Sequence, residues 1–255
     1  MLSPARIKTG AKAFAIHLIC SLFVAVIAAA FVFFFWYPFP FRDLSGGREL
    51  FFLVVSVDVI CGPLLTFVIF NPAKPRAELR RDLFLIALIQ LSALLYGIHT
   101  VWQARPLFLV LELDRFKVIT APALEKSAVD LLPAALQPQF FGGPKTVALR
   151  NPKDRAEQQS VLLDSVQGGR DYAERADFYI PYEGSSAQKA LLRAKSLDIF
   201  LKRYPLETAA AQKIAISKSA DINQWLYLPV TGRQDWIAIV DKQGQIQGFL
   251  PGDGF

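Results

Sequence analysis

Long apolar runs dominate the first part of the chain, and shorter alternating patterns follow them. Three runs reach the roughly 20 residues that a helix needs to cross a bilayer. They cover about residues 14–36, 50–70 and 83–103. The second run contains a single charged residue, Asp58, and the other two contain none. The pattern predicts a three-helix N-terminal transmembrane bundle.

Residues 107–255 show the shorter periods of a water-soluble α+β domain. We expect strands at about 107–119, 145–150, 225–230, 235–241 and 245–250, and helices at about 125–136, 153–167, 186–203 and 206–219. The clearest helix is 186–203, where Ser185 and Gln188 fit a capping box. The last three strands predict an antiparallel meander, and Lys242-Gln243-Gly244 forms its last turn.

The composition agrees with this division and excludes several kinds of catalytic and metal site. Residues 1–103 carry 5 acidic and 9 basic side chains, whereas residues 104–255 carry 17 and 19. Both cysteines and both histidines lie in the first part. The soluble part therefore lacks a thiol nucleophile, a histidine for a catalytic triad and the ligands of a zinc finger. We expect neither enzymatic activity nor a catalytic residue, metal or cofactor. We also expect no binding to nucleic acid, because no cluster of basic residues is interleaved with aromatic residues.

Basic residues set the expected orientation in the membrane. Lys and Arg concentrate in cytoplasmic loops, and here both the N-terminus and the loop at 71–82 are basic, whereas the loop after the first run holds Arg42 and Arg48. The first run is longer than the about 7–15 apolar residues of a cleaved signal, so we expect it to remain a helix. In the inner membrane of a bacterium this predicts a cytoplasmic N-terminus at 1–13, three transmembrane helices within 14–106, and a periplasmic α+β domain at 107–255.

Asp58 is the most informative residue of the membrane part. A carboxyl group about eight residues inside a spanning helix lies roughly 12 Å deep, where it needs a protein or water partner. An antiparallel third helix brings Tyr96 to a similar depth and His99 about one turn nearer the outer surface, so these three residues form a candidate cluster. Gly62 and Pro63 predict a bend just past Asp58. Three roles stay open for Asp58: a structural contact, a partner-binding site, or a proton-relay or transport role. A membrane enzyme that uses Asp58 and His99 is a further hypothesis.

Four segments around the membrane runs carry recognisable motifs. They are KAFAIHLICSLFVA (12–25), WYP (36–38), SVDVICGPLLTFVIF (56–70) and LLYGIHTVWQARPLFLVLELDRFKVI (94–119). Together they resemble the TfpX/TfpZ family of type IV pilin accessory proteins. Motif membership extends to Asp58, Gly62, Pro63, Tyr96 and Gly97, and to a juxtamembrane motif of Arg105, Pro106, Asp114, Arg115 and Phe116. The resemblance implies a protein of piliated bacteria that helps a particular pilin to be assembled, without catalytic residues.

These observations favour a non-enzymatic accessory factor for type IV pilus assembly that engages the pilin in the inner membrane and periplasm. The expected partners are a type IV pilin, the major pilin first, then other pilus assembly proteins and membrane lipid. The alternative is an extracytoplasmic sensor or receptor. Such a receptor would have to signal through a separate membrane partner, because little of the chain is left on the cytoplasmic side.

Overall fold

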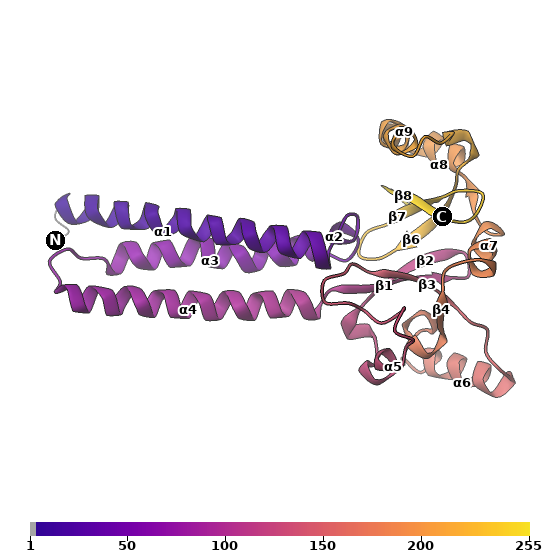
Figure 1. Cartoon of the computed structure of the whole chain (residues 1–255), viewed down its shortest axis with the longest axis horizontal. Coiled ribbons are helices and arrows are strands. Elements are labelled where there is room, and N and C mark those ends of the chain that lie inside the picture. Colours follow the sequence, from indigo (N-terminus) through magenta and orange to yellow (C-terminus); the bar gives the residue numbers. More distant parts are fainter. Residues whose placement is uncertain (1–3) are drawn as a thin grey trace. The chain divides into compact units, whose positions relative to one another are not determined.

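The computed structural model describes residues 4–255, which divide into two compact units (Figure 1). The first unit holds the chain up to Phe34 and then Gly47–Gln103. The second unit holds Phe35–Gly46 and Ala104–Phe255. A segment between the first two long helices therefore belongs to the same unit as the C-terminal half of the chain.

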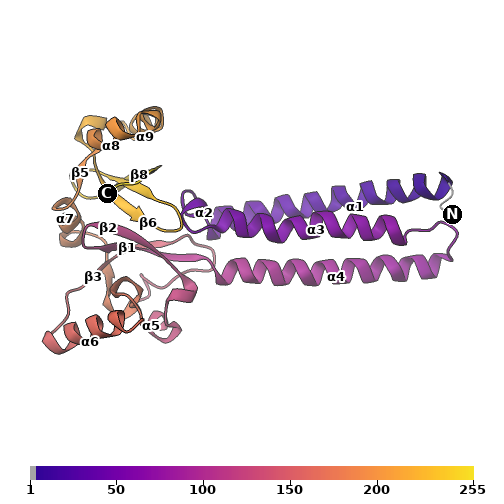
Figure 2. The same ribbon diagram turned by 180° about the vertical axis from the view of Figure 1, so that it is seen from behind.

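The first unit is built from three long helices. They are α1 (Pro4–Phe31), which continues as the π-helical turn η1 (Val32–Trp36), α3 (Gly47–Ile69) and α4 (Arg76–Gln103). Each is long and apolar enough to cross a membrane, which confirms the three apolar helices expected from the sequence. Both α1 and α4 pack against α3, and Figure 2 shows α3 lying between them. Pro63 lies inside α3, which runs on through it to Ile69.

A mixed eight-stranded sheet organises the second unit. Its strands are β1 (Pro106–Glu112), β2 (Arg115–Thr120), β3 (Lys145–Leu149), β4 (Tyr179–Pro181), β5 (Lys195–Ser196), β6 (Leu226–Thr231), β7 (Trp236–Val240) and β8 (Ile246–Pro251). The order is β4-β3-β1-β2-β6-β7-β8, with β5 also paired to β6. The β1–β3 and β2–β6 pairs are parallel, and the others are antiparallel. The α+β fold and the β6–β7–β8 meander are confirmed.

Helices cover this sheet on both faces. They are α2 (Phe41–Leu44), α5 (Lys126–Asp130), α6 (Arg155–Val166), α7 (Ser185–Leu191), α8 (Leu197–Arg203) and α9 (Thr208–Ser217). Alternate residues of the central strand β1 enter different cores: Leu109 and Leu111 face one, and Phe108 and Val110 face the other. Burial on both faces explains why β1 is apolar at nearly every position.

Two predicted elements of this unit are wrong. The expected strand at 107–119 is a hairpin, because the chain reverses after Glu112 and Arg115 pairs back with it. Leu113 occupies the turn at φ 55°, a left-handed conformation that is uncommon for leucine, so the sequence does not indicate the turn. The expected helix at 186–203 is interrupted where Lys195 and Ser196 leave helical geometry and pair with β6. Backbone hydrogen bonding to the sheet there outweighs local helix propensity.

The expected capping box before that helix does not form either. Gly184 occupies the N-cap position of α7, at φ 52°, and no side chain caps the helix there. The hydroxyl of Ser186 instead accepts a hydrogen bond from the Glu183 N–H at 2.9 Å. The start of α7 is therefore set by a glycine turn, one residue before the predicted cap.

The short helix α2 completes the core of the second unit. Phe41 and Leu44 are buried in the same cluster as Leu109 and Phe116. The Leu44 carbonyl accepts a hydrogen bond from the Arg233 N–H at 2.6 Å, so this segment is also tied to the β6–β7 turn. The sequence predicts only a loop between two apolar helices for this stretch. In the structure it is an integral part of the domain core.

Candidate functional site

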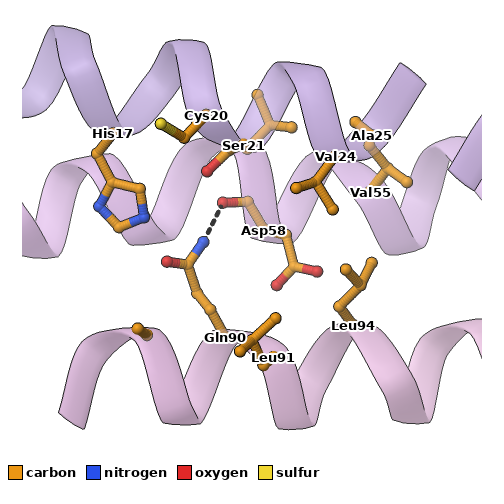
Figure 3. A pocket seen from close by; sticks show the side chains of 12 residues that line it. His17, Cys20, Ser21, Val24, Ala25, Val55, Asp58, Gln90, Leu91 and Leu94 are labelled. Carbon is orange, nitrogen blue, oxygen red and sulfur yellow. Dashed lines mark hydrogen bonds between the residues drawn. The ribbon is translucent and has the colours of Figure 1, made fainter. Parts of the chain in front are cut away.

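A cavity of about 200 Å³ opens among the three long helices and contains Asp58 (Figure 3). Its walls come from residues 17–25 of α1, 55–59 of α3 and 87–94 of α4. Most of these side chains are apolar, and Figure 3 shows the Asp58 carboxyl group pointing from α3 towards α4. A single acid thus lies in an apolar cavity to which all three helices contribute.

Gln90 ties α4 to α3 beside this acid. Its Nε2 donates a hydrogen bond to the backbone carbonyl of Asp58 at 2.9 Å. A Cβ at Gly62 would overlap the Gln90 side chain, so the glycine makes room for it. The Asp58 carboxyl group is left out of this contact: its Oδ2 is buried and has no hydrogen-bond partner among residues 4–255.

His17 ties α1 to α3 at the other end of the cavity. Its Nδ1 lies 2.6 Å from the Thr66 hydroxyl, which is buried. The sequence revealed both His17 and Gln90 as polar residues in apolar runs. It did not reveal which face of each helix they occupy.

The predicted cluster of Asp58 with Tyr96 and His99 does not form. Tyr96 is 75% exposed on α4, and His99 is exposed and stacks on Trp102 with ring centroids 6.1 Å apart. The helix α3 begins at Gly47 instead of about Leu50, so Asp58 lies roughly 4–5 Å farther from the start of its helix than expected. Helical phase adds to this difference, because successive residues of a helix point about 100° apart and Tyr96 faces away from α3.

The juxtamembrane motif separates into a buried part and a surface part. Arg105 is nearly buried, and this burial lowers the pKa of its guanidinium. Pro106 begins β1, and Phe116 lies fully in the core. At the surface, Arg115 Nε donates to Asp114 Oδ1 at 2.8 Å, and its guanidinium lies 4.5 Å from the centre of the Phe255 ring. Most of the motif therefore serves to shape the start of the sheet.

Glu112, next to the hairpin turn, is a partly buried acid whose effect on stability can be tested. Burial raises its pKa, and Lys117 opposes the shift. Ionised Glu112 therefore destabilises the folded state. This loss of stability is absent below the pKa of an unfolded glutamate, about 4.3, and is complete above the raised pKa of the folded state. We expect Glu112→Gln to raise the thermal midpoint of the detergent-solubilised protein at pH 7.5 and to leave it unchanged near pH 4.

Glu157 provides the matched control of opposite sign. Hydrogen bonds from Arg150 and the Lys153 backbone lower its pKa to about 2, so Glu157→Gln should lower the thermal midpoint at pH 7.5. Tryptophan fluorescence of the second unit reports both transitions. A loss of stability in Glu112→Gln of equal size at both pH values would contradict the assigned cause.

Comparisons with known proteins place the chain in a family. A family model described as fimbrial assembly protein FimB matches residues 5–46. The fimbrial assembly proteins of Dichelobacter nodosus serogroups I and E1 are each 34% identical to the chain over 257 residues, covering 98% of it and 98% of the relative. The protein of serogroups C1 and C2 is 45% identical over 115 residues, which cover 45% of this chain and 88% of that protein. No solved structure matches the chain. The similarity over the full length shows that the chain belongs to the family of fimbrial assembly proteins.

Proposed function

We propose that the chain is a non-enzymatic accessory factor for type IV pilus assembly, of the TfpX/TfpZ kind, which engages the pilin in the inner membrane and the periplasm. The observation that carries this proposal is the similarity over nearly the whole chain to proteins described as fimbrial assembly proteins. The matched length includes both the three apolar helices and the mixed-sheet unit, so both parts enter the proposed role.

The combination of apolar helices with a separate α+β unit supports the proposal. A pilin before assembly presents an apolar helix in the membrane and a globular part outside it, and a binder of both needs a membrane surface and a soluble surface. The chain has three apolar helices and an α+β unit, and residues 104–255 contain neither histidine nor cysteine. The basic N-terminus and 71–82 loop support an orientation with residues 1–13 in the cytoplasm and 107–255 in the periplasm.

Deleting the gene and tracking the pilin tests the proposal. We expect a clean deletion strain to lose most surface pili and the full chain to restore them. We also expect the pilin to co-purify with the tagged full chain from detergent-solubilised membranes, because a partner held in both compartments survives mild extraction. A tagged inner-membrane protein unrelated to pili serves as the control. Normal piliation in the deletion strain would contradict the proposal.

A further inference from the structure

The three membrane helices leave an open face around Asp58. Because α1 and α4 both pack on α3, they flank the cavity described above, whose floor includes Val55 and Asp58. Small residues of α1 and α4 line this cavity, among them Ser21, Ala25 and Ala87. Small residues allow another helix backbone to approach closely inside a bilayer.

The acid in this cavity has an acceptor atom that no described residue satisfies. Oδ2 of Asp58 is buried and has no hydrogen-bond partner within the described residues 4–255. Gln90 donates to the Asp58 backbone carbonyl and His17 contacts Thr66. Ser21 also lines the cavity, but no described residue donates a hydrogen bond to Oδ2. A buried polar atom without a partner in hydrocarbon costs free energy. The cavity is therefore chemically incomplete until a donor enters it.

We propose that this cavity is the docking groove for a fourth membrane-spanning helix, an apolar helix of the pilin that presents a hydrogen-bond donor opposite Asp58. A helix is the form of chain that enters hydrocarbon with its own backbone groups satisfied. A lipid acyl chain would fill the volume and bring no donor. The inference rests on the proposed function, and it adds the place and the chemistry of the membrane contact.

A second copy of this chain is a poorer occupant than a pilin helix. Two copies that dock face to face about a two-fold axis present the same surface to each other. Such a pairing would bring a second Asp58 carboxyl group towards the first, and two carboxyl groups that share a site repel each other when both are ionised. A helix of another protein that carries a hydrogen-bond donor therefore complements the groove better than a second copy of this chain does.

Site-specific photo-crosslinking in intact membranes tests the groove. A photoreactive phenylalanine analogue replaces Leu91, which lines the cavity, or Ile89, which is exposed on α4 and does not line it. We expect Leu91 to crosslink to the pilin and Ile89 to give at least about tenfold less product. Crosslinking of Leu91 to a second copy of the chain, or to no protein at all, would overturn the inference.

Substitutions at the acid test the donor. We expect Asp58→Leu to reduce the Leu91 crosslink about tenfold or more, the loss expected for a buried hydrogen bond to an acid. Ser56→Leu, the matched control on the exposed side of α3, should leave it unchanged. An undiminished crosslink in Asp58→Leu would overturn the role of the acid. Pilin that still co-purifies with the chain while Leu91 never crosslinks to it would leave the proposed function standing and remove the groove.

Discussion

Residues 104–255 expressed alone are expected not to fold, whereas the same residues joined at their N-terminus to residues 35–46 through a flexible linker are expected to fold cooperatively. The reason is the core: Phe41 and Leu44 are 8% and 0% exposed and pack among strand residues of the second unit. Losing a buried Phe and a buried Leu costs about 3–5 and 2–5 kcal/mol. That total is comparable to the whole stability of a typical domain, about 5–15 kcal/mol.

Backbone contacts add to the expected loss. The Arg233 N–H would lose its 2.6 Å hydrogen bond to the Leu44 carbonyl, at the point where Gly232 approaches the same carbonyl too closely to carry a Cβ. Near-UV circular dichroism and urea titration of the two fragments, followed by the fluorescence of Trp225 and Trp236, measure the difference. A cooperative transition in residues 104–255 alone would show that the segment is not needed.

Point substitutions in the linked fragment separate core packing from mere length. Leu44→Ala should lower the free energy of unfolding by about 2–5 kcal/mol. Phe39→Ala should cost less than about 1 kcal/mol, because Phe39 is 57% exposed although its ring touches Trp236. Similar losses from the two substitutions would contradict the assignment of α2 to the core.

The segment 35–46 also shows where the sequence stops being informative. Its aromatic residues match the composition of an interfacial belt at a helix end, yet Tyr37 and Phe41 are buried within the second unit. Four helical residues in α2 are too few to produce a hydrophobic period. What buries them is a contact with strands about 70 to 200 residues later in the chain, and no local pattern encodes such a contact.

The three long apolar helices were predictable for the opposite reason. An uninterrupted apolar run is a local property, and the bilayer thickness converts it directly into a helix. Asp58 stood out because it is the one charge in such a run. Its neighbours were harder to predict, because one residue of difference along a helix turns a side chain by about 100° and a shifted start changes its depth. Counting residues along the helices therefore predicted Tyr96 as the neighbour of Asp58, whereas the structure places Gln90 there.

Gly97→Leu is expected to remove most of the protein from the membrane, whereas Tyr96→Leu, one residue earlier, is expected to leave its level unchanged. Gly97 is buried, and a Cβ there would overlap the side chain of Val54 on α3. Val54 is β-branched and stiff, so it cannot move aside as a long side chain would. Larger side chains at such a crossing force the helices apart, at a cost of about 1–3 kcal/mol or more.

Tyr96 provides the control because the same helix presents it outward, 75% exposed. Leucine there removes a ring and a hydroxyl from a surface that no described helix covers, so folding should not change. Immunoblots of membrane fractions and thermal aggregation of the solubilised variants measure both effects. Gly62→Ala should fall between the two, because the Gln90 side chain that a Cβ would displace is flexible, although the move gives up its hydrogen bond to the Asp58 carbonyl. If Tyr96→Leu proved as damaging as Gly97→Leu, the helical phase of α4 would be wrong, and with it the placement of Gln90 beside Asp58.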